Sequence, residues 1–119
     1  MMNIEVNGNN IKVKLYNNSS ADALKELLKK GPLTISMKDY AHMEKFGSFG
    51  MQFPTNDEQI TTEAGDVILS EGNLLVIYYA PNTWNFTRLG KVQNLSETEL
   101  KQVLGKGAIT AVLSLSDEE

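Results

Sequence analysis

Ala64-Gly65-Asp66-Val67-Ile68-Leu69 opens the stretch that decides the fold of this chain, and the stretch continues to residue 113. An apolar run at 66–70 is followed by the tight turn Glu71-Gly72-Asn73 and by a second apolar run at 74–79. Short apolar runs bounded by turn residues predict strands, and a connection this short predicts a hairpin. A further strand is predicted at 86–92, and the stretch ends with a helix and a last strand.

The helix of this stretch has the strongest local signals. Ser96 is a residue type that caps helices, and Glu99 stands at the reciprocal position of a capping box. Leu95 and Leu100 have the spacing of a hydrophobic staple, and Gly105 is typical of a helix C-terminus. These residues predict a short helix between Ser96 and Gly105.

The N-terminal third predicts a hairpin and one more strand. Residues 4–6 and 11–15 alternate between apolar and polar types, and Asn7-Gly8-Asn9-Asn10 between them tolerates positive φ angles. Residues 33–37 alternate in the same way and predict a third strand.

A helix is predicted between this hairpin and the third strand. Leu24, Leu27 and Leu28 fall on one side of it, which is the pattern of an amphipathic helix. Ser19 or Ser20 is expected to cap the helix, with Asp22 as a capping-box partner of Ser19, and Gly31-Pro32 is expected to stop it.

The periodicity fades between Asp39 and Thr62, where Gly47, Gly50 and Pro54-Thr55-Asn56-Asp57 indicate turns and irregular chain. The alternative interpretation of this segment is that it contains short strands around 45–49. Seven or eight short strands with two helices do not form the strand–helix alternation of a parallel sheet. The predicted fold is therefore mainly β, a closed barrel of about eight strands with two capping helices.

Composition excludes several classes of protein. The 119 residues predict a single domain over 1–119, and 41% hydrophobic with 22% charged residues is an ordinary globular balance. A net charge of −4 argues against nucleic acid as a partner, and the absence of cysteine excludes disulfides and thiolate chemistry. The longest apolar run is too short to span a bilayer and no signal peptide opens the chain, so we expect no membrane association. A cytoplasmic location is expected, or secretion if a leader has been removed.

Several separate blocks of the chain, taken in order, resemble the cyclophilin-like family. The blocks are Leu33-Thr34-Ile35-Ser36-Met37 with Asp39-Tyr40, Pro54-Thr55-Asn56, Ala64-Gly65-Asp66-Val67-Ile68-Leu69, Leu75-Val76-Ile77-Tyr78-Tyr79 and Thr87-Arg88-Leu89-Gly90-Lys91. Together they cover nearly the whole chain, and they are most similar to small bacterial cyclophilin-like domains of uncharacterised function. The resemblance implies the closed barrel. It also raises peptidyl-prolyl isomerisation, the activity of true cyclophilins.

The residues that carry isomerase chemistry are largely replaced here. In the isomerases an arginine donates to the prolyl nitrogen, while aromatic and methionine side chains hold the proline ring. Arg88 is the only arginine of this chain and lies in a different segment, and Phe86 stands where the isomerases place a histidine. Lys45 is the only nearby substitute for the arginine, and the segment 46–52 shares residue types with the proline pocket but not its spacing.

One set of side chains predicts a binding groove. Its members come from the irregular segment and from the strand that cyclophilins use for binding, namely Phe46, Phe49, Met51, Trp84, Phe86 and Arg88. Aromatic and methionine side chains on the flank of a barrel can form a groove for an apolar group or an extended peptide. The alternative is that half or more of them belong to the core. Trp84 follows the turn Pro81-Asn82-Thr83 and is the one most expected to be partly exposed.

Arg88 has two interpretations. It alternates with Phe86, so the two side chains are expected to share one face of a strand. As a ligand anchor, Arg88 would hold a carboxylate or carbonyl oxygen. As a structural residue, it would tie its strand to an acidic side chain such as Asp66 or Glu63.

Other polar clusters predict no chemistry. Asp39, His42 and Glu44 could hold a divalent ion if a turn gathered them, but their spacing matches no metal motif. The acidic residues of 57–63 lack the apolar neighbours that would raise a carboxyl pKa, and the glycines do not form a phosphate loop. We therefore expect no catalytic residue, no metal and no cofactor.

Three functions follow as hypotheses. The first is a non-enzymatic module that binds a small molecule or an extended peptide in the predicted groove. The second is a divergent prolyl isomerase that uses the same groove, which would need a donor other than Arg88 in the pocket. The third is a structural or oligomerisation role, which an exposed apolar patch in a dimer contact would support. The oligomeric state is left open.

Overall fold

The structure is a computed structural model that describes residues 1–116. Its strands are β1 (Met2–Val6), β2 (Asn9–Leu15), β3 (Leu33–Tyr40), β4 (Glu44–Ser48), β5 (Glu58–Thr61), β6 (Asp66–Ser70), β7 (Leu74–Tyr78), β8 (Thr83–Val92) and β9 (Ile109–Leu115). Its helices are α1 (Ser19–Leu28) and α2 (Glu97–Leu104). Within the described part of the chain, neither helix has the length and apolar character needed to cross a membrane.

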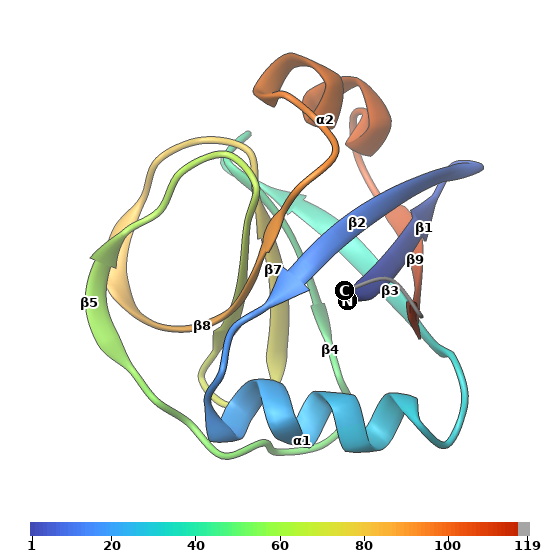
Figure 1. Ribbon diagram of the computed structural model, residues 1–119. Coiled ribbons are helices and arrows are strands. Elements are labelled where there is room, and N and C mark those ends of the chain that lie inside the picture. The colour runs from blue at the N-terminus through green and yellow to red at the C-terminus, as the bar shows by residue number, and fades with distance from the viewer. Residues whose placement is uncertain (117–119) are drawn as a thin grey trace.

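Eight of the strands described in residues 1–116 close into an antiparallel barrel, as Figure 1 shows. Their order is β2-β1-β9-β3-β4-β7-β6-β8, and β8 pairs back with β2. The extra strand, β5, pairs with the first half of β8 through the register Glu58↔Phe86 to Thr61↔Thr83. α1 and α2 lie at opposite ends of the molecule in Figure 1 and bury leucines in the barrel core. The predicted mainly β barrel with two capping helices is confirmed.

The seam between β2 and β8 depends on a glycine. The register there runs from Val13↔Val92 to Leu15↔Gly90. A Cβ atom at Gly90 would lie 2.6 Å from the carbonyl oxygen of Lys14 and 2.6 Å from Cγ1 of Val13. Real Cβ atoms do not approach other atoms this closely, so the missing side chain allows the two strands to meet and close the barrel.

The apolar runs of β6 and β7 are buried on both faces of the sheet. Alternate side chains point into the barrel, where Val67, Leu69, Leu75 and Ile77 join the main core. The others, Ile68, Val76 and Tyr78, form a second apolar cluster on the outside together with Ile60 of β5 and Phe86 of β8. We call this set the outer cluster. It explains why consecutive positions of these strands are apolar, since each face has its own apolar partners.

Several local predictions are confirmed. Asn7 (φ 52°) and Gly8 (φ 79°) form the turn between β1 and β2, with the positive φ angles that a two-residue hairpin of this type requires. Ser96 and Glu99 form the complete capping box at the start of α2. The β6–β7 hairpin turns where predicted, at Glu71-Gly72-Asn73.

The predicted cap of α1 is wrong. Asn18 caps the helix, and its side-chain oxygen accepts a hydrogen bond from the backbone nitrogen of Ala21 at 2.8 Å. Ser19 and Ser20 lie inside the first turn, so Asp22 is not at the capping-box position. Ser20 is instead buried, and its hydroxyl donates to the carbonyl oxygen of Pro54. Asn, Ser and Asp all cap helices, and a run of such residues does not reveal locally which one takes the role.

The segment from 39 to 62 is more ordered than its sequence predicts. It completes β3, contains β4 and β5, and leaves irregular chain between 49 and 57. In that irregular part, Phe49 and Phe53 pack edge to face with ring centroids 4.7 Å apart and join the barrel core. Asn56 binds the hydroxyls of Ser19 and Ser20 through its side chain at 2.8 and 2.9 Å. The segment is therefore anchored to the core and to α1.

The two described ends of the chain meet. The backbone nitrogen of Ser116 donates to the carbonyl oxygen of Met1 at 2.8 Å, next to the pairing of β1 with β9.

Candidate functional site

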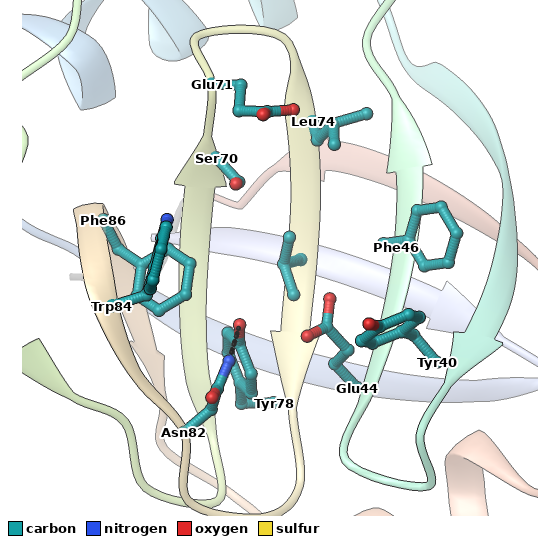
Figure 2. Close-up of a pocket in the computed structure, with 11 residues that line it drawn as sticks. Tyr40, Glu44, Phe46, Ser70, Glu71, Leu74, Tyr78, Asn82, Trp84 and Phe86 are labelled. Atoms are coloured by element: carbon teal, nitrogen blue, oxygen red, sulfur yellow. Dashed lines mark hydrogen bonds between the residues drawn. The ribbon is translucent and has the colours of Figure 1, made fainter.

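The candidate site is a pocket of about 430 Å³ on the outside of the barrel, over β4, β6, β7 and β8. Its floor is the side of the outer cluster that faces away from the barrel, where Val76 and Tyr78 of β7 lie. Small-molecule pockets in proteins have volumes of roughly this size and are mostly apolar. We call this hollow the outer pocket, and Figure 2 shows its lining.

Aromatic side chains form the two walls of the outer pocket. Trp84 and Phe86 of β8 stand on one side, and Tyr40 of β3 and Phe46 of β4 stand on the other (Figure 2). The rings of Tyr40 and Phe46 pack edge to face, with centroids 6.3 Å apart. In the sheet, β4 pairs with β7, β7 pairs with β6, and β6 pairs with β8. This order places the two walls on either side of Tyr78.

The walls combine buried and exposed rings. Phe86 is 4% exposed, and its centroid lies 5.5 Å from that of Tyr78. Trp84 is 66% exposed and Tyr40 is 58% exposed, which makes them the two most exposed large hydrophobic side chains that the structure describes. The predicted exposure of Trp84 is confirmed. Both exposed rings therefore lie at the opening of the pocket.

Polar groups also lie on the floor of the outer pocket. The side-chain nitrogen of Asn82 donates to the hydroxyl oxygen of Tyr78 at 3.1 Å, as the dashed line in Figure 2 marks. The carboxyl group of Glu44 lies near the Tyr78 hydroxyl, and each group shifts the pKa of the other. Glu44 is 8% exposed. Because β4 and β7 pair in the register Glu44↔Tyr78, the two side chains are direct cross-strand neighbours.

Burial sets the protonation behaviour of this pair. Burial raises the pKa of the Glu44 carboxyl, the nearby hydroxyl of Tyr78 opposes that shift, and the negative charge of Asp39 adds to it. Burial also raises the pKa of the Tyr78 hydroxyl, and although the hydrogen bond from Asn82 opposes the shift, the nearby Glu44 increases it. Tyr78 therefore stays a neutral hydrogen-bond donor, and Glu44 is the ionisable group of the floor.

A second carboxylate, that of Glu71, lies at one end of the outer pocket. Glu71 is exposed and lies in the β6–β7 turn beside Ser70. No lysine, arginine or histidine lines the pocket within residues 1–116. The charged groups of its lining are therefore acidic only.

Three of the six predicted groove residues line this pocket, namely Phe46, Trp84 and Phe86. Phe49 does not, because the chain leaves β4 after Ser48 and turns the ring toward Phe53 in the barrel core. Met51 is exposed on the irregular segment and does not line the pocket either.

Arg88 lies outside the outer pocket. Its guanidinium is 3.4 Å from the carboxylate of Glu58, at the edge of a different hollow that also includes Tyr16 and Lys91. The expected partners Asp66 and Glu63 instead pair with Lys91, at 3.0 and 3.3 Å. Phe86 lines the outer pocket and Arg88 lines the other hollow. Phe86 pairs with Glu58 of β5, whereas Arg88 pairs with Ile68 of β6.

Lys45 points to the inside of the barrel and is fully buried. Its amine donates to the carbonyl oxygen of Gly107 at 2.6 Å and lies 3.2 Å from the carboxylate of Asp39. Tyr79 also donates its hydroxyl hydrogen bond to Asp39. The desolvation of Asp39 acts to raise its pKa, but the hydrogen bonds from Tyr79 and Lys45 outweigh it and hold the pKa below the ordinary value. Lys45 is thus a structural cation and does not face the outer pocket.

The residues considered for a metal do not gather. The side chain of His42 is 98% exposed and lies 3.6 Å from Asp39, whereas Glu44 faces the outer pocket. Within the described residues, no group of three or more histidine, cysteine, aspartate and glutamate side chains could hold a metal ion.

Comparison with known proteins decides the family. A family profile described as the cyclophilin-like family matches residues 4–114. The chain belongs to the cyclophilin-like family. No curated protein matches it, and no solved structure does. Membership agrees with the closed barrel, and within this cyclophilin-like domain the outer pocket combines the exposed rings of Trp84 and Tyr40 with the buried polar groups of Glu44 and Tyr78.

Sequence reasoning about this cyclophilin-like domain missed several lining residues, namely Tyr40, Glu44, Glu71, Tyr78 and Asn82. Part of the signal was present, since Glu44 and Phe46 alternate on β4 as Val76 and Tyr78 do on β7. That β4 and β7 are neighbours, however, is a long-range pairing with no local signature.

Proposed function

We propose that this cyclophilin-like barrel is a non-enzymatic binding module whose outer pocket takes a small molecule or an apolar group of an extended peptide. The supporting observation is that Trp84 and Tyr40 remain exposed on opposite sides of the pocket floor. Large aromatic rings are usually buried because each one removes much apolar surface from water. Two such rings at one opening favour a surface that a ligand completes.

The isomerase alternative receives less support from the same lining. It needs a donor for the prolyl nitrogen, and the two cations considered from the sequence are engaged elsewhere. Lys45 binds Asp39 inside the barrel, and Arg88 pairs with Glu58 outside the pocket. The donors that line the outer pocket, such as Asn82 and Trp84, are neutral. We therefore keep binding without catalysis as the first proposal.

Trp84 offers a direct test, because it is the only tryptophan of the chain and lies at the pocket opening. Its emission would be recorded during titration with 3-phenylpropylamine, 3-phenylpropanol, 3-phenylpropanoate and the peptide Ala-Ala-Pro-Phe. We expect a saturable change in emission with at least one of the four. If none of them produced a saturable change, the proposal would be rejected.

A pair of tyrosine variants locates the binding. Tyr40→Ala removes a ring from the pocket wall, whereas Tyr16→Ala removes an exposed ring outside the pocket. We expect Tyr40→Ala to weaken binding about 3- to 10-fold, the range of one aromatic contact, and Tyr16→Ala to leave it unchanged. Equal effects of the two variants would place binding elsewhere.

A protease-coupled prolyl isomerisation assay separates binding from catalysis. We expect no catalysis above background with an Ala-Pro-Phe type peptide. Catalysis that disappears in Arg88→Ala would move the isomerase hypothesis to first place.

A further inference from the structure

We infer that the outer pocket selects a small organic cation, a molecule that carries an ammonium group on an apolar body. This inference rests on the proposed binding function and adds the charge of the ligand. Its basis is the combination of aromatic walls with one carboxylate on the floor and another at one end of the same pocket.

The charges of the lining favour a cation and disfavour an anion. Glu44 lies on the floor between Tyr78 and Tyr40, and Glu71 lies in the turn at one end of the pocket, as Figure 2 shows. Within residues 1–116 no lysine, arginine or histidine lines the pocket to balance them. An anionic ligand would meet two like charges and no partner, which costs free energy in a partly desolvated site.

Glu44 has unused capacity to bind a cation. A carboxylate accepts about four hydrogen bonds, and the polar side chain next to Glu44 on the neighbouring strand is that of Tyr78. Within the described chain no lysine, arginine or histidine is ion-paired with Glu44. A neutral apolar ligand would remove the remaining water from Glu44 without replacing it, whereas an ammonium group would supply charge-assisted hydrogen bonds.

The aromatic walls favour the same ligand. Cations are attracted to the faces of tryptophan, tyrosine and phenylalanine rings, and clusters of such rings recognise organic ammonium groups. Trp84 and Phe86 face Tyr40 and Phe46 across Tyr78 in Figure 2. The pocket thus offers rings for the apolar body and the cationic group, and carboxylates for the charge.

The dimensions favour a small molecule over a peptide. The pocket is bounded by the Glu71 turn at one end and by Asn82 at the other, and its volume is about 430 Å³. That size lies within the range of small-molecule sites.

The test compares three ligands of matched shape and different charge. Trp84 emission would be titrated with 3-phenylpropylamine as the cation, 3-phenylpropanol as the neutral analogue and 3-phenylpropanoate as the anion. We expect the amine to bind at least about tenfold more tightly than the alcohol, and the anion to bind most weakly. The advantage of the amine should shrink as salt is added.

Matched carboxamide variants assign the effect to the pocket. Glu44→Gln keeps the size of the side chain and an acceptor for Tyr78, and it should abolish the preference for the amine. Glu58→Gln, at an exposed carboxylate outside the pocket, should keep the preference. Circular dichroism and a thermal melt would check that each variant is folded. If Glu44→Gln did not fold, Glu71→Gln would replace it, and an unchanged preference in that variant would overturn the inference.

The other outcomes separate this inference from the proposed function. Equal binding of the amine and the alcohol would overturn the cation selectivity and leave the binding function in place. No binding of any of the three compounds or of Ala-Ala-Pro-Phe would overturn both. If the peptide Ac-Ala-Lys-Ala-NH2 bound tenfold more tightly than the amine, the ligand would be a lysine side chain of a peptide and the small-molecule assignment would be wrong.

Discussion

Trp84 and Phe86 lie two positions apart on β8, yet their surroundings differ. Phe86 is 4% exposed and packs in the outer cluster beside Ile60 and Tyr78. Trp84 is 66% exposed at the opening of the outer pocket. At the scale of single residues, one aromatic side chain stabilises the fold and the other is available for a ligand.

This difference predicts unequal costs on truncation. Trp84→Ala should lower the free energy of unfolding by less than ~1 kcal/mol, because little apolar surface is buried there. Phe86→Ala should lower it by about 3–5 kcal/mol, because it empties a buried site. Urea denaturation followed by far-ultraviolet circular dichroism measures both values. A loss for Trp84→Ala as large as that for Phe86→Ala would make Trp84 a core residue.

At the scale of single elements, α1 is held to the barrel by its capping residue. The side-chain oxygen of Asn18 accepts from the backbone nitrogen of Ala21, and its side-chain nitrogen donates to the carbonyl oxygen of Arg88 at 2.8 Å. One side chain thus caps the helix and joins it to β8.

Asn18→Ala should therefore destabilise the protein by about 1–2 kcal/mol, since it removes the cap and leaves the Arg88 carbonyl oxygen without this donor. Asn17→Ala is the matched control, because Asn17 is the neighbouring exposed asparagine and lies before the cap. Its unfolding free energy should stay within ~0.5 kcal/mol of the unchanged protein. Chemical denaturation of the two variants side by side makes the comparison, and equal losses would contradict the assigned cap.

The elements show how far local sequence signals reach. The capping box of Ser96 and Glu99 was predicted because both residues act within one turn of the chain. The division between Phe46, at the pocket, and Phe49, in the core, was not predicted. It depends on where β4 ends and on how the chain then packs against Phe53, which are tertiary effects.

At the scale of the whole molecule, the site depends on which strands become neighbours. Glu44 and Tyr78 meet because β4 pairs with β7, and the two walls stand on either side of Tyr78 because β7 and β6 lie between β4 and β8. The barrel could be predicted from strand count, turn residues and family resemblance. The pocket could not, because register between distant strands is set by packing of the whole sheet.

Closure itself predicts an effect at Gly90. Gly90→Ala should destabilise the protein by about 1–3 kcal/mol, because the added methyl would overlap with Lys14 and Val13 at the seam. Asn85→Ala, at an exposed position of the same strand away from the seam, should have little effect. Thermal and urea unfolding of both variants test this. A stable Gly90→Ala protein would mean that the seam can widen without cost.

Because Ser116 is hydrogen-bonded to Met1, the path of the chain from residue 1 to residue 116 is almost a closed circle. A peptide of a few residues could join Ser116 to Met1. The chain could then be reopened at an exposed turn such as Asn7-Gly8, and every strand would keep its neighbours. A protein joined at Met1 or Ser116 would emerge beside β1 and β9, whereas the ligand-facing surface belongs to β4, β7 and β8. The domain could therefore be immobilised on a sensor surface through its ends with its pocket facing the solution.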